Sequence, residues 1–317
     1  MDDTKKHHGA ELPELFKERE DLLLAEYREH EQKEKTGDPK KQIGIPRVLH
    51  FHEMLPFWTA FFDRLGFELV LSDVTNPQLI YRSVENVVAE TCFPVKVING
   101  HIVDLKEKGV KKIFLPSIIN MPREHPDQDE NYLCPLSQAM PYLARSAFSF
   151  EEEDIEVLQP YFNFQHEEKH LIKQMERFGK SLGKSKTAIK EALAAARKAQ
   201  ATFESKCLER GREIMTRLGD FRQAVVILSR PYNGCDPGLN LGLPKKLHDM
   251  GVLAIPMDFL PANGDENMVR LATMYWKSGQ RILAAAEQIK INPQLHGIFI
   301  TCKGCENQCE IRKITFG

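Results

Sequence analysis

The sequence alternates short apolar runs with helical patterns in two separate stretches, one beginning near residue 43 and one near residue 222. Apolar strands separated by helices form βαβ units, whose strands are parallel and covered on both faces. We therefore predict an α/β fold of two parallel-sheet halves with a helical connector and an N-terminal helix. The predicted parts are a tail and helix at 1–42, a first α/β domain at 43–153, a helical connector at 154–221 and a second α/β domain with a C-terminal cysteine motif at 222–317.

The pattern places three strands in each half. The expected strands are Ile43–Leu49, Phe67–Leu71, Lys112–Pro116, Ala224–Ser229, Gly251–Pro256 and Gly297–Thr301. The expected helices between them are Leu55–Leu65, Pro77–Ala89, Val95–Lys108, Leu243–Met250 and Met268–Ile289. Right-handed crossovers bring the carboxyl ends of the strands to one edge, where open sheets bind their ligands.

Charge and hydropathy exclude some classes of protein. The 317 residues have a formal net charge of -2, so no overall basic field favours nucleic acid. No run of 18 apolar residues and no basic-then-apolar leader is present. We therefore expect a cytoplasmic protein with no membrane partner. In such a protein the seven cysteines are expected to be reduced thiols, metal ligands or redox groups rather than disulfides.

Cys92 and Cys134 each stand just before a proline that fits the first turn of a helix. We expect each of them to lie at a helix start directly after a strand. The N–H groups and dipole at such a position lower the pKa of a thiol and favour an anionic partner. Two interpretations remain, a ligand or catalytic thiol and a buried structural cysteine. For Cys207, in a helical stretch, burial is expected, and Cys235 is expected in a polar turn.

The segment from Cys302 through Cys305 to Cys309 carries CxxC and CxxxC spacings. A two-residue gap with a glycine lets two sulfur atoms face one metal centre. Three cysteines are one fewer than a structural zinc site or a cubane cluster usually uses. An iron–sulfur cluster, a zinc ion and incidental thiols are the open alternatives.

Other polar groups near the strand ends are candidates too. Arg230, Tyr232 and Asn233 could bind a substrate at the cleft edge, or form a strand-end turn in which Arg230 is solvated. The segment 238–242 has neither a GxGxxG nor a Walker pattern, so nucleotide binding is not supported. For His50 and His52 we expect positions facing solvent. The aromatic residues expected in the core are Phe57, Trp58, Phe61 and Phe62.

Several motifs occur in an order that is specific to one family. They are Ile45-Pro-Arg-Val-Leu49, Leu55-Pro-Phe-Trp58, Glu90-Thr-Cys-Phe-Pro-Val-Lys96, Gly100-His-Ile-Val-Asp104, Ile113-Phe-Leu-Pro-Ser117, Cys134-Pro135, Arg230-Pro-Tyr-Asn233 and Met274-Tyr-Trp276. From about Leu15 to Thr301 the chain resembles the activase-related part of long acyl-CoA dehydratase activases. That part is itself similar to the iron–sulfur subunits of 2-hydroxyacyl-CoA dehydratases, benzoyl-CoA reductases and double-cubane cluster proteins.

This resemblance implies two flavodoxin-like domains with a 4Fe–4S or double-cubane cluster between them. The cluster ligands of the family map onto Cys92, Cys134 and Cys305. An ATP-hydrolysing activase would supply low-potential electrons. Two differences stand out: some relatives have cysteine in place of Ser117, and the chain ends in a cysteine stretch that long relatives carry before the Leu15 helix. The second difference is the pattern expected of a fragment, a rearranged gene or a short variant.

The leading hypothesis is an iron–sulfur redox protein, a reductase or dehydratase-type component that passes electrons to a small substrate such as an acyl-CoA. The alternative hypothesis is a non-catalytic scaffold that zinc stabilises and that docks an ATPase. The expected partners are the activase, the small substrate and a second copy of the chain in a homodimer.

Overall fold

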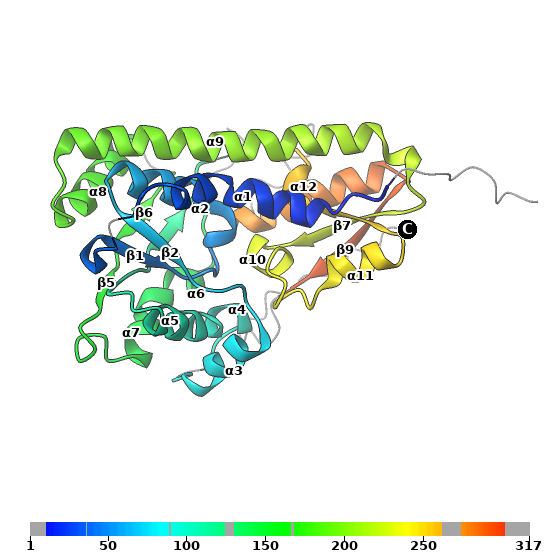
Figure 1. The fold of residues 1–317 in the computed structure, drawn as a ribbon. Helices are drawn as coiled ribbons and strands as arrows, with labels where there is room; N and C mark the ends of the chain where they lie inside the picture. The colour runs from blue at the N-terminus through cyan, green and yellow to red at the C-terminus, as the bar shows by residue number, and fades with distance from the viewer. Residues whose placement is uncertain are drawn as a thin grey trace, which may run out of the picture.

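The structure is a computed structural model that describes residues 11–35, 37–88, 90–123, 130–165, 168–261 and 274–301. Two groups of parallel strands lie side by side with helices packed around them (Figure 1). Helix α9 runs along both groups, and α1 lies beneath it (Figure 1). The architecture confirms the predicted α/β fold of two parallel-sheet halves with a helical connector and an N-terminal helix.

The first half has a four-stranded parallel sheet in the order β2-β1-β3-β5. This order agrees with that of flavodoxin-like sheets. A two-stranded parallel sheet, β4-β6, continues the β3-β5 pair after short breaks. The strands are β1 (Gln42–Ile45), β2 (Glu68–Leu71), β3 (Lys112–Phe114), β4 (Ser117–Asn120), β5 (Glu156–Leu158) and β6 (Tyr161–Asn163). Strands β5 and β6 occupy a stretch that the sequence predicted to be helical, and that prediction was wrong there.

Six helices accompany these strands among the described residues. They are α2 (Phe51–Arg64), α3 (Pro77–Glu85), α4 (Phe93–Lys96), α5 (Ile98–Glu107), α6 (Pro135–Gln138) and α7 (Met140–Ala147). Local residues determine where α3 begins. Asn76 caps the helix by accepting hydrogen bonds from the N–H groups of Gln78 and Leu79, and Pro77 occupies the first turn. Helix α2 buries the expected aromatic residues Phe57, Trp58, Phe61 and Phe62 in the core, which confirms that prediction.

The second half has a three-stranded parallel sheet in the order β8-β7-β9. Its elements are β7 (Ala224–Ser229), α10 (Pro231–Gly234), α11 (Leu243–Asp249), β8 (Leu253–Pro256), η3 (Met257–Phe259), α12 (Lys277–Ile291) and β9 (Leu295–Ile300). Strand β7 has the predicted bounds, because its continuous apolar run is buried between its two neighbours. The helix expected from Met268 begins at Lys277 in the described chain, and residues 268–273 lie outside the described residues.

The remaining elements join the halves. They are α1 (Leu15–Glu31), η1 (Pro39–Lys41), α8 (Glu168–Ser181), α9 (Lys186–Thr216) and η2 (Leu218–Asp220). Helix α1 packs against α2 and β2 of the first half and against β8 of the second. It therefore fastens the two halves together. No helix in the described ranges is both long and apolar enough to cross a membrane.

Candidate functional site between the two halves

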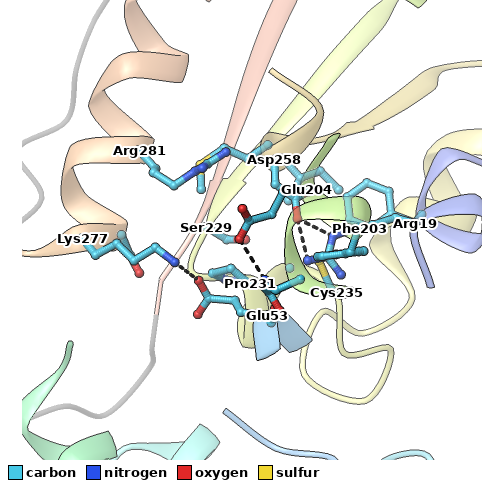
Figure 2. Close-up of a pocket in the computed structure, with 16 residues that line it drawn as sticks. Arg19, Glu53, Phe203, Glu204, Ser229, Pro231, Cys235, Asp258, Lys277 and Arg281 are labelled. Carbon is cyan, nitrogen blue, oxygen red and sulfur yellow. Dashed lines mark hydrogen bonds and ion pairs between the residues drawn. The ribbon is translucent and has the colours of Figure 1, made fainter. Parts of the chain in front are cut away.

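A pocket lies at the carboxyl end of β7, between the halves (Figure 2). Helices α1, α2 and α9 contribute one part of its lining. The end of β7, α10, the residues after β8 and the start of α12 contribute the other. Its charged and polar lining residues are Arg19, Glu53, Gln200, Glu204, Ser229, Cys235, Asp258, Lys277, Ser278 and Arg281. The pocket is thus at the sheet edge where parallel α/β folds place their ligands.

Arg19 is the most deeply buried cation of this pocket, with 1% of its surface exposed. Its Nε and Nη2 atoms lie 2.6 and 2.5 Å from Asp258 Oδ2, and Nη2 also donates to the carbonyl oxygen of His52 at 2.8 Å. Burial alone would raise the pKa of Asp258, but the Arg19 guanidinium outweighs burial and holds that pKa below its usual value. One side chain of α1 therefore contacts both halves.

A second ion pair crosses between the halves nearby. Lys277 Nζ of α12 lies 2.7 Å from Glu53 Oε1 of α2, and both side chains are mostly buried. Burial would raise the pKa of Glu53, and the Lys277 charge and hydrogen bond lower it below its usual value. His50 stands one turn earlier than Glu53, and its buried Nε2 atom has no hydrogen-bond partner among the residues that the structure describes. Burial lowers the pKa of His50 to about 4, so the ring is neutral at pH 7.

The expectation that His50 and His52 face solvent was wrong. Their exposed fractions are 6% and 5%. Helix α2 begins at Phe51 rather than at Leu55, so these histidines belong to its first turn and not to a preceding loop. That turn is covered by Arg19 of α1 and by α10 of the second half.

A chain of buried polar side chains connects the halves on another side of His52. Thr75 Oγ1 donates to Asp236 Oδ2 at 2.5 Å and lies 3.0 Å from His101 Nε2. His101 Nδ1 lies 2.7 Å from Ser72 Oγ. His52 Nε2 stands 3.5 Å from Asp236 Oδ2. The loop after α10 thereby docks on the loop between β2 and α3.

The loop at residues 236–239 of the second half has a backbone conformation that allows this contact. Asp236 Oδ1 accepts hydrogen bonds from the N–H groups of Gly238 and Leu239, so the carboxylate also holds its own loop. A Cβ atom at Gly238 would stand 2.5 Å from Thr75 Cγ2, closer than side chains allow. The glycine is therefore required for the approach.

Cys92 and Cys134 occupy the N-cap positions of α4 and α6, as the prolines predicted. Neither side chain caps its helix through a hydrogen bond. The expectation that each directly follows a strand was wrong, since the described residues just before them, 90–91 and 130–133, belong to no strand of the sheets. Cys92 is buried, whereas Cys134 is partly exposed.

The apolar cluster around Cys92 draws on both halves. Leu136, two residues after Cys134, packs against it, and Tyr232 of the second half belongs to it. Arg230 Nη1 donates to the Tyr232 hydroxyl at 2.9 Å, and Asn233 is buried. Tyr232 and Asn233 are thus buried at this position, while Arg230 is partly exposed.

The other cysteines divide into two groups. Cys207 is buried as predicted, and Cys235, directly after α10, lines the pocket. Burial raises the pKa of Cys235 to about 12, so it is a neutral thiol. Cys302, Cys305 and Cys309 lie outside the described residues. Within the described ranges, no three Cys, His, Asp or Glu side chains are grouped so that they could hold a metal ion.

Sequence reasoning missed Arg19, Thr75, His101 and Asp258, and it placed Asp236 only as part of a loop at the cleft. One signal was available for Arg19, because it stands four residues after Leu15 and four before Leu23 and so shares their buried helix face. Asp236 begins an Asp-Pro-Gly turn, which marks a loop but not its partner. Asp258 carries no local signal of its role.

Comparison with known proteins gives one match. The model of a family described as CoA enzyme activase uncharacterised domain (DUF2229) matches residues 42–260, which is more than half of the chain. No curated protein and no solved structure matches the chain.

Proposed function

Because the chain belongs to the family of the CoA enzyme activase uncharacterised domain (DUF2229), we propose that it is an iron–sulfur component of an acyl-CoA-directed redox system. In this proposal a cubane-type cluster is held between the halves by Cys92, Cys134 and Cys305. An ATP-hydrolysing activase delivers low-potential electrons, and the chain passes them to a small substrate such as an acyl-CoA. We also propose, as part of the same hypothesis, that the chain is related to the iron–sulfur subunits of dehydratases and reductases.

The observation that supports this proposal most is the apolar cluster shared by Cys92, Leu136 and Tyr232. It brings a candidate thiol, the helix that Cys134 begins and the Arg230–Asn233 segment into one packed region. A cluster with thiolate ligands is favoured where surrounding apolar groups limit access of water.

The donor set fits such a cluster in its chemistry. Cys92 and Cys134 are thiols at helix N-caps, and soft sulfur ligands are those that iron–sulfur clusters use. The described residues supply only two of the proposed ligands, and Cys305 belongs to the segment outside them. When bound, the cluster would supply single electrons at low potential. The chain itself would hold it, and Tyr232 would screen it from water.

The test is reconstitution of the full chain with iron and sulfide under anaerobic conditions. We expect bound iron and sulfide, visible absorbance and a paramagnetic resonance signal in the reduced protein. Cys92→Ser, Cys134→Ser and Cys305→Ser should each lower the iron content, because serine is a harder and far less acidic ligand. Cys207→Ser is the matched control, since Cys207 is equally buried but lies in α9.

Two results would contradict the proposal. One is an iron content in Cys92→Ser equal to that of the unchanged chain. The other is stoichiometric zinc without visible absorbance, which supports the scaffold that docks an ATPase. The partner is tested separately by ATP-dependent reduction of the reconstituted cluster by an activase.

A further inference from the structure

Four cations follow one another along the solvent-facing side of α8. Their spacing of four, four and three residues places them on one side of the helix. The opposite side of α8 is buried and packs against α9 and β6. The four residues, called the basic stripe below, are all exposed: Lys169, Lys173, Arg177 and Lys180.

The acidic residues of α8 are directed away from the basic stripe. Glu168 Oε1 lies 2.5 Å from Arg197 Nη1, and Glu176 Oε1 lies 3.3 Å from Lys186 Nζ. Both of these cations belong to α9. Helix α8 therefore turns its negative charges toward its neighbour in the fold and its positive charges toward solvent.

This arrangement is unfavourable for α8 itself. Lys173 stands one turn from both Lys169 and Arg177, and like charges at that spacing destabilise a helix. In α1 the same spacing joins opposite charges, since Lys17 Nζ lies 3.2 Å from Asp21 Oδ2. Lys173 forms no ion pair with any residue that the structure describes. The stability of the helix thus gives no reason for the basic stripe.

An exposed tyrosine borders the basic stripe. Arg177 Nη1 donates to the hydroxyl of Tyr161 at 3.4 Å, and Tyr161, the first residue of β6, is 53% exposed. Arginine and tyrosine are among the residue types that contribute most to the affinity of protein interfaces. This pair therefore favours a protein partner.

Charge and polarity disfavour other anionic partners. Helix α8 has four Lys or Arg residues and two Glu residues, whereas the whole chain has a formal net charge of -2. The rest of the molecule is thus negative and repels a long polyanion such as nucleic acid. Every exposed residue of α8 is polar, so the helix offers no exposed apolar side chain for insertion into a membrane. A short acidic surface on a protein meets both conditions.

We propose that the basic stripe of α8 is a docking surface for an acidic helix of another protein. Residues one turn apart are separated by about 6 Å along a helix axis. A partner helix with Glu or Asp at the same interval presents its carboxylates in register with the basic stripe, so that several ion pairs form together. Helix α8 lies at the end of the first half that is remote from the second half (Figure 1). The inference goes beyond the proposed function and does not depend on a cluster.

The first test is binding of a synthetic helical peptide to the full chain, measured by fluorescence anisotropy at physiological salt. The peptide has glutamate at one-turn intervals. A second peptide of identical composition has its glutamates spread around the helix. We expect the first peptide to bind about tenfold more tightly, and added salt to weaken its binding. Equal affinities would show a general attraction between opposite charges and would overturn the proposal.

Charge reversal locates the binding surface. Lys173→Glu combined with Arg177→Glu should weaken binding about tenfold, because each reversal replaces an attraction by a repulsion. Lys245→Glu combined with Lys246→Glu is the matched control, since both lysines are exposed on α11 of the second half. It should change the Kd by less than about twofold. Equal losses in the two variants would overturn the proposal. If the first variant fails to fold, Lys173→Gln with Lys180→Gln removes charge without reversing it and should still weaken binding.

Thermal unfolding separates binding from a structural role. Lys173→Gln removes two like-charge neighbours, so the melting temperature should stay the same or rise. A lower melting temperature would show that Lys173 stabilises the fold, which contradicts a role in docking alone. Duplex RNA and phosphatidylserine vesicles are the competing probes. If either binds more tightly than the peptide and loses its binding in the Lys173→Glu, Arg177→Glu variant, the assignment to an acidic protein is overturned.

Discussion

The core of the first half and the contact between the halves are both buried, but they are built from different groups. Aromatic rings pack around Trp58 in the core, with ring centroids 4.7 Å from Phe114 and 5.2 Å from Phe162. The contact between the halves has ion pairs and hydrogen bonds at its centre, such as Arg19 with Asp258. Apolar packing does not depend on pH or on a single partner, whereas buried charges depend on both. Fold stability and the attachment of the halves should therefore respond to different changes.

Removal of a central ring should have the largest effect. Phe62 is fully buried, with ring centroids 5.0 Å from Phe114 and 6.1 Å from Phe178. Phe62→Ala leaves a cavity and should lower the free energy of unfolding by about 3–5 kcal/mol. Denaturant unfolding measures this. Tyr81→Ala is the control, since Tyr81 is 65% exposed and should change stability by less than about 0.5 kcal/mol. Equal effects of the two substitutions would contradict the role of the aromatic core.

Loss of Arg19 should come next in size. Arg19→Met removes the contacts to Asp258 and to the His52 carbonyl. We expect the free energy of unfolding to fall by about 3 kcal/mol. This is the lower end of the range for a broken buried ion pair, because the Asp258 side chain keeps 21% exposure. Calorimetry should show the unfolding transition broaden or split as the halves uncouple. Adding Asp258→Asn should recover part of the loss. A double variant no more stable than Arg19→Met would contradict this account.

The smallest expected change in the free energy of unfolding is the one caused by pH. The folded pKa values of His50 and His101 are about 4, below the value of about 6.5 in unfolded chains. The unfolded chain then binds more protons between these values, so the free energy of unfolding falls as pH drops from 6.5 toward 4. The slope is about 1.4 kcal/mol per pH unit for each histidine. The carboxylates with lowered pKa values lose their contribution only at lower pH, so unfolding measured from pH 7.0 to 5.5 isolates the histidines.

This pH effect also sharpens the comparison. His50→Gln should remove about half of the slope, while Phe62→Ala should shift the whole curve without changing its slope. A free energy of unfolding that is constant from pH 7.0 to 5.5 would show that these histidines are not neutral in the folded chain.

The sequence predicts elements whose signal is local. Strand β7 is a continuous apolar run, and the prolines after Cys92 and Cys134 mark helix starts, so these were placed correctly. Strands β5 and β6 have three residues each and border a charged stretch, which gave no strand period to detect. Their pairing with β3 and β4 determines their structure instead.

The polar groups between the halves show the limit of this approach. Burial of His52 depends on Arg19 and Asp236, which come from α1 and from the second half. A local sequence pattern cannot reveal contacts between residues that only the tertiary structure brings together. The ligand role of Cys92, Cys134 and Cys305 stays a prediction for the same reason, because their spacing in sequence does not fix their separation in space.

The pairing of Arg19 with Asp258 also sets an order for synthesis of the chain. The two residues are 239 positions apart, so α1 leaves the ribosome long before its buried arginine has a counter-ion. At about 5–20 residues per second, this delay lasts on the order of 10–50 s. During that time α1 can pack on α2 and β2, but its buried Arg19 lacks the Asp258 carboxylate. Helix α1 is therefore made well before the residue that completes its buried ion pair, and its docking is completed only after residue 258 has emerged.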